Sequence, residues 1–140
     1  MGQQQLLLLV LGIVIVGLAV VIGIQAFGEN QKKANADAMV NDAVRIASDA
    51  QAFALKPAAF GGGGLDEATF TKLGYENTGG TYTNLNANYT ITSGTDCVLI
   101  TGVSKEDTPV NSVYVGVGGT KTTSITTQIN GTAVTACTAD

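Results

Sequence analysis

Residues 6–27 read LLLLVLGIVIVGLAVVIGIQAF, and this stretch decides how the chain folds. From position 6 to position 24 it holds only Leu, Val, Ile, Ala and Gly, and Gln25 is its one polar residue. A helix of this composition is apolar on every face, so no side of it suits water. Its 22 residues would extend over about 33 Å, which is enough to cross the apolar core of a bilayer. We therefore expect a helix that is buried in a membrane or in the core of an assembly.

We expect this stretch to remain in the working protein. It is longer than the usual apolar region of a secretory signal peptide, and it lacks the Ala-x-Ala cleavage pattern. No ionisable side chain precedes Glu29, so the net charge of −4 is carried by the residues from there on. Gly12, Gly17 and Gly23 each weaken a helix by roughly 1 kcal/mol relative to Ala, but they permit close approach between helices.

The helical pattern continues beyond Gly28 with a different character. Apolar residues recur at spacings of three and four and form one stripe, made of Ala36, Met39, Val40, Ala43, Ile46, Ala47, Ala50, Phe53 and Ala54. The rest of the helix surface is expected to carry Asp37, Asp42, Arg45, Asp49 and Gln51. Pro57 should end the helix, because proline disfavours helical geometry in the residue before it. The sequence predicts one helix from about residue 3 to about residue 55.

A glycine-rich loop and a β-rich region follow the helix. Residues 61–64 are four consecutive glycines, but no Gly-Lys-Ser/Thr follows them, so they do not match a phosphate-binding loop. A short helical turn is expected around residues 66–68. Runs rich in Thr, Val, Ile and Tyr predict strands around Tyr82 and at residues 89–92, 97–101, 113–117 and 122–129. Turn signals lie at residues 93–94, 105–107, 118–119 and 130–131.

These elements predict an α+β fold. Its parts are a long N-terminal helix, first apolar and then amphipathic, and a small antiparallel sheet of three to five strands that packs on the amphipathic half. We expect three segments along the chain. Residues 1–28 form the transmembrane or filament-core half of the helix, residues 29–56 the amphipathic half, and residues 57–140 a globular head.

The chain has two cysteines, Cys97 and Cys137. They are too far apart for a CxxC motif and too few for a zinc site. In an exported protein they would most simply form one disulfide, and closing a loop of about 41 residues would stabilise the fold by about 4 kcal/mol on the chain-entropy model. The alternative is two buried free thiols in a cytosolic protein. The apolar N-terminal stretch implies export and favours the disulfide.

The composition also disfavours several classes of function. The chain has no His, so the usual general base and the commonest metal ligand are both missing. No spacing pairs a nucleophile with a base, and we expect neither an enzyme nor a cofactor. Lys32 and Lys33 are the only adjacent basic pair in an acidic chain, so we expect no nucleic-acid partner.

Two N-glycosylation patterns occur in the β-rich region. They begin at Asn88 and Asn130, each followed two residues later by a threonine. Both asparagines are candidate glycosylation sites, although such matches arise easily by chance in a region rich in Asn and Thr.

A neutral apolar helix that continues as an amphipathic helix, then a glycine loop, a sheet and a cysteine pair, resembles bacterial type IV pilins and the related pseudopilins. The specific part is the start MGQQQL at residues 1–6 and the apolar run after it. The resemblance implies a structural subunit that waits in the inner membrane and then polymerises with identical copies into an extracellular filament. Residues of the apolar helix, among them Leu9, Val14 and Ile22, would form the filament core. It also implies a prepilin peptidase and a pilus assembly machinery as partners.

The resemblance carries expectations about the N-terminus. Family members are made with a short basic leader, which the peptidase removes before it methylates the new first residue. A leader of two uncharged residues would lack the positive charge that orients insertion. We therefore expect Met1 to be the mature, N-methylated residue, and the alternative is a chain that starts at Gln3.

Gln5 departs from the family pattern, because major pilins usually have a glutamate there. That glutamate is thought to pair with the terminal amine of a neighbouring subunit. Gln5 can hydrogen-bond an ammonium group but cannot neutralise its charge. An atypical or minor pilin fits this departure. The alternatives are a pseudopilin of a type II secretion or DNA-uptake system, and a membrane-anchored enzyme or binding domain.

Overall fold

The computed structural model of the protein describes residues 2–105, 110–119 and 125–131. Within these ranges, one long helix comes first, followed by two short 3-10 turns and five strands. The chain divides into two compact units, of which the first ends at Ala34 and the second begins at Asn35. Each unit is described by itself below.

The helix α1 extends over Gly2–Leu55 and is not broken at Gly28. It ends one residue before Lys56, whose backbone N–H donates to the carbonyl of Phe53 at 3.2 Å. This end agrees with the restriction that Pro57 places on the residue before it. The two 3-10 turns follow, η1 at Ala58–Phe60 and η2 at Leu65–Glu67.

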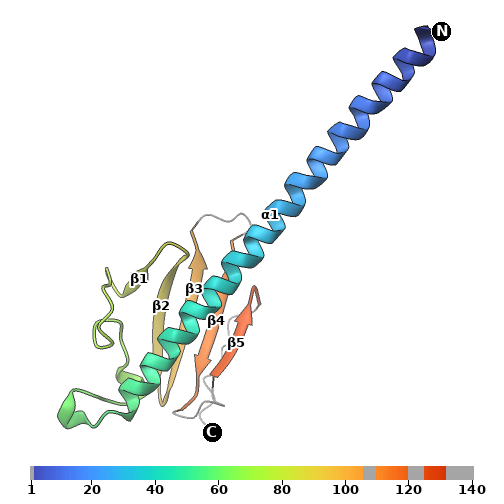
Figure 1. Ribbon diagram of the computed structural model, residues 1–140. Helices are drawn as coiled ribbons and strands as arrows, with labels where there is room; N and C mark the ends of the chain where they lie inside the picture. Colours follow the sequence, from blue (N-terminus) through green and yellow to red (C-terminus); the bar gives the residue numbers. More distant parts are fainter. Residues whose placement is uncertain (1, 106–109, 120–124, 132–140) are drawn as a thin grey trace. The chain divides into compact units, whose positions relative to one another are not determined.

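The five strands form one antiparallel sheet in which each strand pairs with the next along the chain (Figure 1). Their bounds are β1 Thr81–Thr83, β2 Ala87–Gly94, β3 Cys97–Ser104, β4 Ser112–Val117 and β5 Ile125–Ile129. The expected α+β class, with a long N-terminal helix and an antiparallel sheet, is confirmed. The strand expected at 122–129 is described only from residue 125.

The turn between β2 and β3 lies two residues later than the sequence suggests. Ser93 and Gly94 were expected to turn, but Gly94 still pairs with Cys97 in the ladder. The turn is made by the next two residues, and the second of them, Asp96, has a φ of 56°. Aspartate tolerates this left-handed conformation better than most residues, so the longer hairpin is accessible.

In the second unit, the apolar stripe of α1 packs on one face of the sheet. The helix contributes to the buried core Met39, Ala43, Ile46, Ala47, Ala50 and Phe53. The strands contribute Ala87, Tyr89, Val98, Ile100, Val113, Val115 and Val117. Val40 and Ala54 of the predicted stripe are partly buried against this core. Beneath the ring of Tyr89 lies Gly102, where an added Cβ would approach the ring carbon Cε1 to 2.8 Å.

Two polar side chains that the sequence assigned to the helix surface instead hold the helix to the sheet. Gln51 is only 7% exposed, and its Nε2 donates to the carbonyl of Gly119 at 3.0 Å. Asp42 is half-buried, and its Oδ2 accepts hydrogen bonds from Asn84 Nδ2 at 2.7 Å and Asn86 Nδ2 at 2.9 Å. The hydroxyl of Tyr89 donates to the same oxygen at 3.1 Å.

The connection between β1 and β2 is shaped to meet this carboxylate. Asn84 Oδ1 accepts the backbone N–H groups of Asn86 and Ala87, both at 2.9 Å. The side chain thereby closes a tight turn, and the two asparagine amides reach Asp42 from one short segment. One carboxylate of α1 thus fixes the start of the sheet.

We expect Asp42→Ala to lower the free energy of unfolding of the second unit by about 2 kcal/mol, because three donors lose a charged acceptor. The measurement is a urea titration of the full chain in neutral detergent, followed by tyrosine circular dichroism. Asp37→Ala is the matched control, since Asp37 is an exposed carboxylate on the same helix. Equal midpoints for the two variants would contradict the role given to Asp42.

Candidate assembly surface

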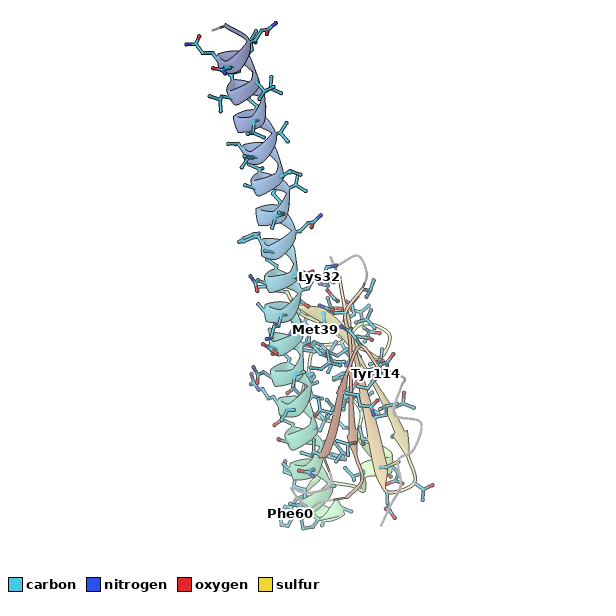
Figure 2. The ribbon with its side chains drawn as sticks, turned by 90° about the vertical axis from the view of Figure 1, so that its right-hand side faces the viewer. Lys32, Met39, Phe60 and Tyr114 are labelled. Atoms are coloured by element: carbon cyan, nitrogen blue, oxygen red, sulfur yellow. The ribbon has the colours of Figure 1, made fainter. Side chains whose placement is uncertain are left out.

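The first unit presents apolar side chains on every side of α1. Each Leu, Val, Ile and Phe between residues 6 and 27 is more than half exposed, and the sticks in Figure 2 project from all sides of this part of the helix. Leu9, Val14 and Ile22, which were expected to serve assembly, are 62%, 52% and 65% exposed. Gln5 is exposed near the start of the helix.

This apolar surface is unfavourable in water and is expected to be buried against another apolar surface. An 18-residue window of α1 has a mean hydropathy of 3.3, and none of the window is buried. It is therefore long and apolar enough to cross a membrane. Soluble monomers rarely expose apolar patches beyond a few hundred Å², and each Å² left in water costs about 25 cal/mol. Lipid chains or apolar helices are the environments that remove this cost.

The glycines of the first unit have no role in packing within the described chain. A Cβ added at Gly12, Gly17 or Gly23 would meet nothing within 4 Å. Each of these residues weakens the helix by about 1 kcal/mol relative to Ala, and no contact here compensates for it. Each leaves a small notch, a position without a side chain between the larger apolar side chains of the helix.

Two of the residues singled out from the sequence lie outside the described residues. These are Met1, the expected methylation site, and Cys137, the expected disulfide partner. Cys97 is disulfide-bonded and buried at the first position of β3.

The two asparagines of the glycosylation patterns both take part in hydrogen bonds of the sheet. Asn88 is half-buried in β2, and its Oδ1 accepts from the hydroxyl of Thr83 at 2.9 Å. Asn130 follows β5 with a φ of 50°. Its Oδ1 accepts the backbone N–H of Ser112 at 2.8 Å, and its Nδ2 donates to Asn111 Oδ1 at 3.0 Å. Both amide atoms of Asn130 therefore fasten the end of β5 to the start of β4.

A cluster of four aromatic rings next to α1 was not identified from the sequence. Tyr75 lies 5.9 Å from Phe70 and 5.0 Å from Tyr82, and Tyr82 lies 6.0 Å from Tyr89, measured between ring centroids. The hydroxyl of Tyr75 donates to Asp49 Oδ2. Burial, with the hydrogen bond and the negative charge of Asp49, raises the pKa of Tyr75 to about 12. The pKa of Tyr89 is also raised, first by burial and then by the charge of Asp42.

Neither a candidate metal site nor a similar known protein indicates what this chain does. Within the part of the chain that the structure describes, no three His, Cys, Asp or Glu side chains form a group suited to a metal ion. Comparisons with protein-family models, with curated proteins and with solved structures found no match to this chain. Its function is therefore inferred from its own surfaces.

The raised pKa of Tyr75 predicts alkaline instability of the second unit. The folded state binds the Tyr75 proton more tightly than the unfolded chain does. The stabilisation that Tyr75 gives the fold is therefore full below pH 10.0, and it falls as the pH rises through about 12. Thermal midpoints of the full chain measured over this range should decline less steeply in Tyr75→Phe than in the parent. Superimposable declines would contradict the prediction, and comparison with the parent removes the contributions that the two chains share.

Proposed function

We propose that the protein is a structural subunit that polymerises through its N-terminal helix into an extracellular type IV pilus-like filament. The observation that carries the proposal is the first unit, a helix whose side chains are apolar and exposed on every face from residue 6 to residue 24. The same chain continues into a folded unit whose own core is already filled. The apolar helix is thus left for a partner outside the subunit.

Two environments suit this helix in turn. Before assembly, lipid covers it, because its length and hydropathy match a bilayer. In the filament, copies of the same helix cover one another, and association rests on close contact and the exclusion of water. Gln3, Gln4 and Gln5 would supply amides near the helix start, where an assembled core requires every polar group to be hydrogen-bonded.

The glycines favour assembly over a simple membrane anchor. A helix that only anchors a protein in lipid binds more tightly when its side chains are large, since every added methylene buried in the bilayer contributes about 0.8 kcal/mol. Gly12, Gly17 and Gly23 do not contribute in this way, and no neighbouring atom of their own unit requires a glycine there. Small residues are instead typical of surfaces where two apolar helices come close.

The second unit suits the outside of such a filament. It has a buried core of its own between α1 and the sheet. Cys97 is disulfide-bonded, as is usual in the oxidising space outside the cytoplasm. The subunit would therefore display this unit on the filament surface while the first unit is buried.

The test is electron microscopy of cell surfaces that carry the full chain. We expect filaments from the parent and from Val14→Ile, and none from Val14→Asp, because a charged group is costly among apolar helices. The aspartate variant should keep the parent's unfolding midpoint in the second unit. The proposal fails if the parent forms no filaments, or if Val14→Asp filaments are as abundant as those of the parent.

Gly17→Leu separates assembly from anchoring. The change makes the helix more hydrophobic, so the subunit should remain in the membrane fraction. A leucine would fill the notch that a neighbouring helix needs, so filaments should be fewer, or should dissociate at a lower temperature. The readouts are the membrane-bound fraction and the filament melting temperature, and Leu9→Ile is the control. Unchanged filaments in Gly17→Leu would contradict the contact role of this glycine.

A further inference from the structure

A groove lies between the last turns of α1 and residues 72–75 of the second unit. Its volume is about 380 Å³, and it is lined by Arg45, Asp49, Ala52, Phe53, Lys56, Lys72, Leu73, Gly74 and Tyr75. This volume falls in the range of small-molecule sites, which is roughly 300 to 1,000 Å³. Neither the apolar helix nor the filament proposal makes use of it.

The groove gathers positive charge on an acidic protein. Arg45, Lys56 and Lys72 are three of the seven cationic side chains of a chain with net charge −4. Asp49 is the one carboxylate among the described residues of the lining, and its Oδ2 already accepts from the hydroxyl of Tyr75. The lining therefore carries a formal excess of positive charge.

Two of these cations have no ion-pair partner among the residues that the structure describes. Lys72 Nζ lies 2.6 Å from Glu67 Oε2, and this contact lowers the pKa of Glu67. Within residues 2–105, 110–119 and 125–131, neither Arg45 nor Lys56 forms an ion pair. Asp49 lies one helical turn after Arg45, at a spacing where opposite charges can pair, but the two side chains do not meet within 4.0 Å.

The lining also has an apolar part. Phe53 is 6% exposed and belongs to the core, while Leu73 is partly buried against the same core. Together with Ala52, these residues offer a firm apolar surface beside the cations. Binding sites for small organic molecules combine such a surface with a few polar groups that fix the orientation of the ligand.

We infer that this groove binds a small organic anion, namely a carboxylate or phosphate group carried on a body with an apolar face. Arg45 presents a planar set of donors that fits either anion in a bidentate manner. Lys56 and Lys72 add point charges, and Phe53 and Leu73 contact the apolar part of the ligand. The inference does not depend on the filament, because all lining residues belong to the second unit.

Phenyl phosphate and inorganic phosphate serve as probes for the full chain in neutral maltoside micelles, with binding measured by calorimetry. We expect phenyl phosphate to bind more tightly than inorganic phosphate, because only the former has a body for the apolar lining. Arg45→Gln and Lys56→Gln should each weaken phenyl phosphate binding by about tenfold. Arg45→Lys should have a smaller effect, since it keeps the charge and loses the planar donors.

Lys105→Gln is the matched control. It removes the same charge from an exposed position outside the groove, and at moderate salt distant surface charges are largely screened. Its affinity for phenyl phosphate should equal that of the parent. The inference is overturned if phenyl phosphate does not bind, if inorganic phosphate binds equally well, or if Lys105→Gln weakens binding as much as Arg45→Gln. Unfolding midpoints of all variants establish that each second unit is folded.

Discussion

The contact between one stripe of α1 and one face of the sheet is the interaction on which the second unit depends. The stripe is rich in alanine, with Ala43, Ala47 and Ala50 all fully buried. Small side chains let a helix lie close to a sheet, and interiors are packed too densely to leave such space empty. Because the helix lies close, polar side chains at the margins of the stripe reach the sheet. Asp42 and Gln51 do so at two separate places.

Much of this fold follows from periodicity. Apolar spacings of three and four placed the helix and its stripe correctly, and the residues before Pro57 marked its end. Strand positions followed from runs of β-branched and aromatic residues. Asp42 and Gln51 were assigned wrongly because a hydrophobic pattern sorts residues by polarity alone. It contains no information about an acceptor or donor that another segment brings to the edge of the stripe.

The turn between β2 and β3 was misplaced for a related reason. Gly94 favours turns on composition, but its partner in the ladder is Cys97. The register of the two strands is decided by which side chains enter the core, since a shift by one residue would turn every one of them to the other face. Asp96 accepts a left-handed conformation as the consequence.

The two candidate sites differ in how visible they are in the sequence. The apolar helix is a continuous run, so composition alone identifies it as a surface that needs a partner. The groove joins Arg45 on α1 and Lys56 just after its end to Lys72 and Tyr75 on a later segment. No spacing rule connects positions that meet only after the helix has packed on the rest of the unit. The Asn84 to Asn86 segment had a visible cue, the alternating asparagines, but its partner Asp42 was not predictable from it.

The order of the sheet has a consequence for how the molecule forms. Each strand pairs with its neighbour in the sequence, and two residues suffice to connect β2 to β3. Short connections cost little loop-closure entropy, and chains dominated by such local contacts fold quickly. The sheet can therefore grow hairpin by hairpin as the chain is synthesised. The stripe of α1 is synthesised earlier and provides the apolar surface on which those hairpins pack.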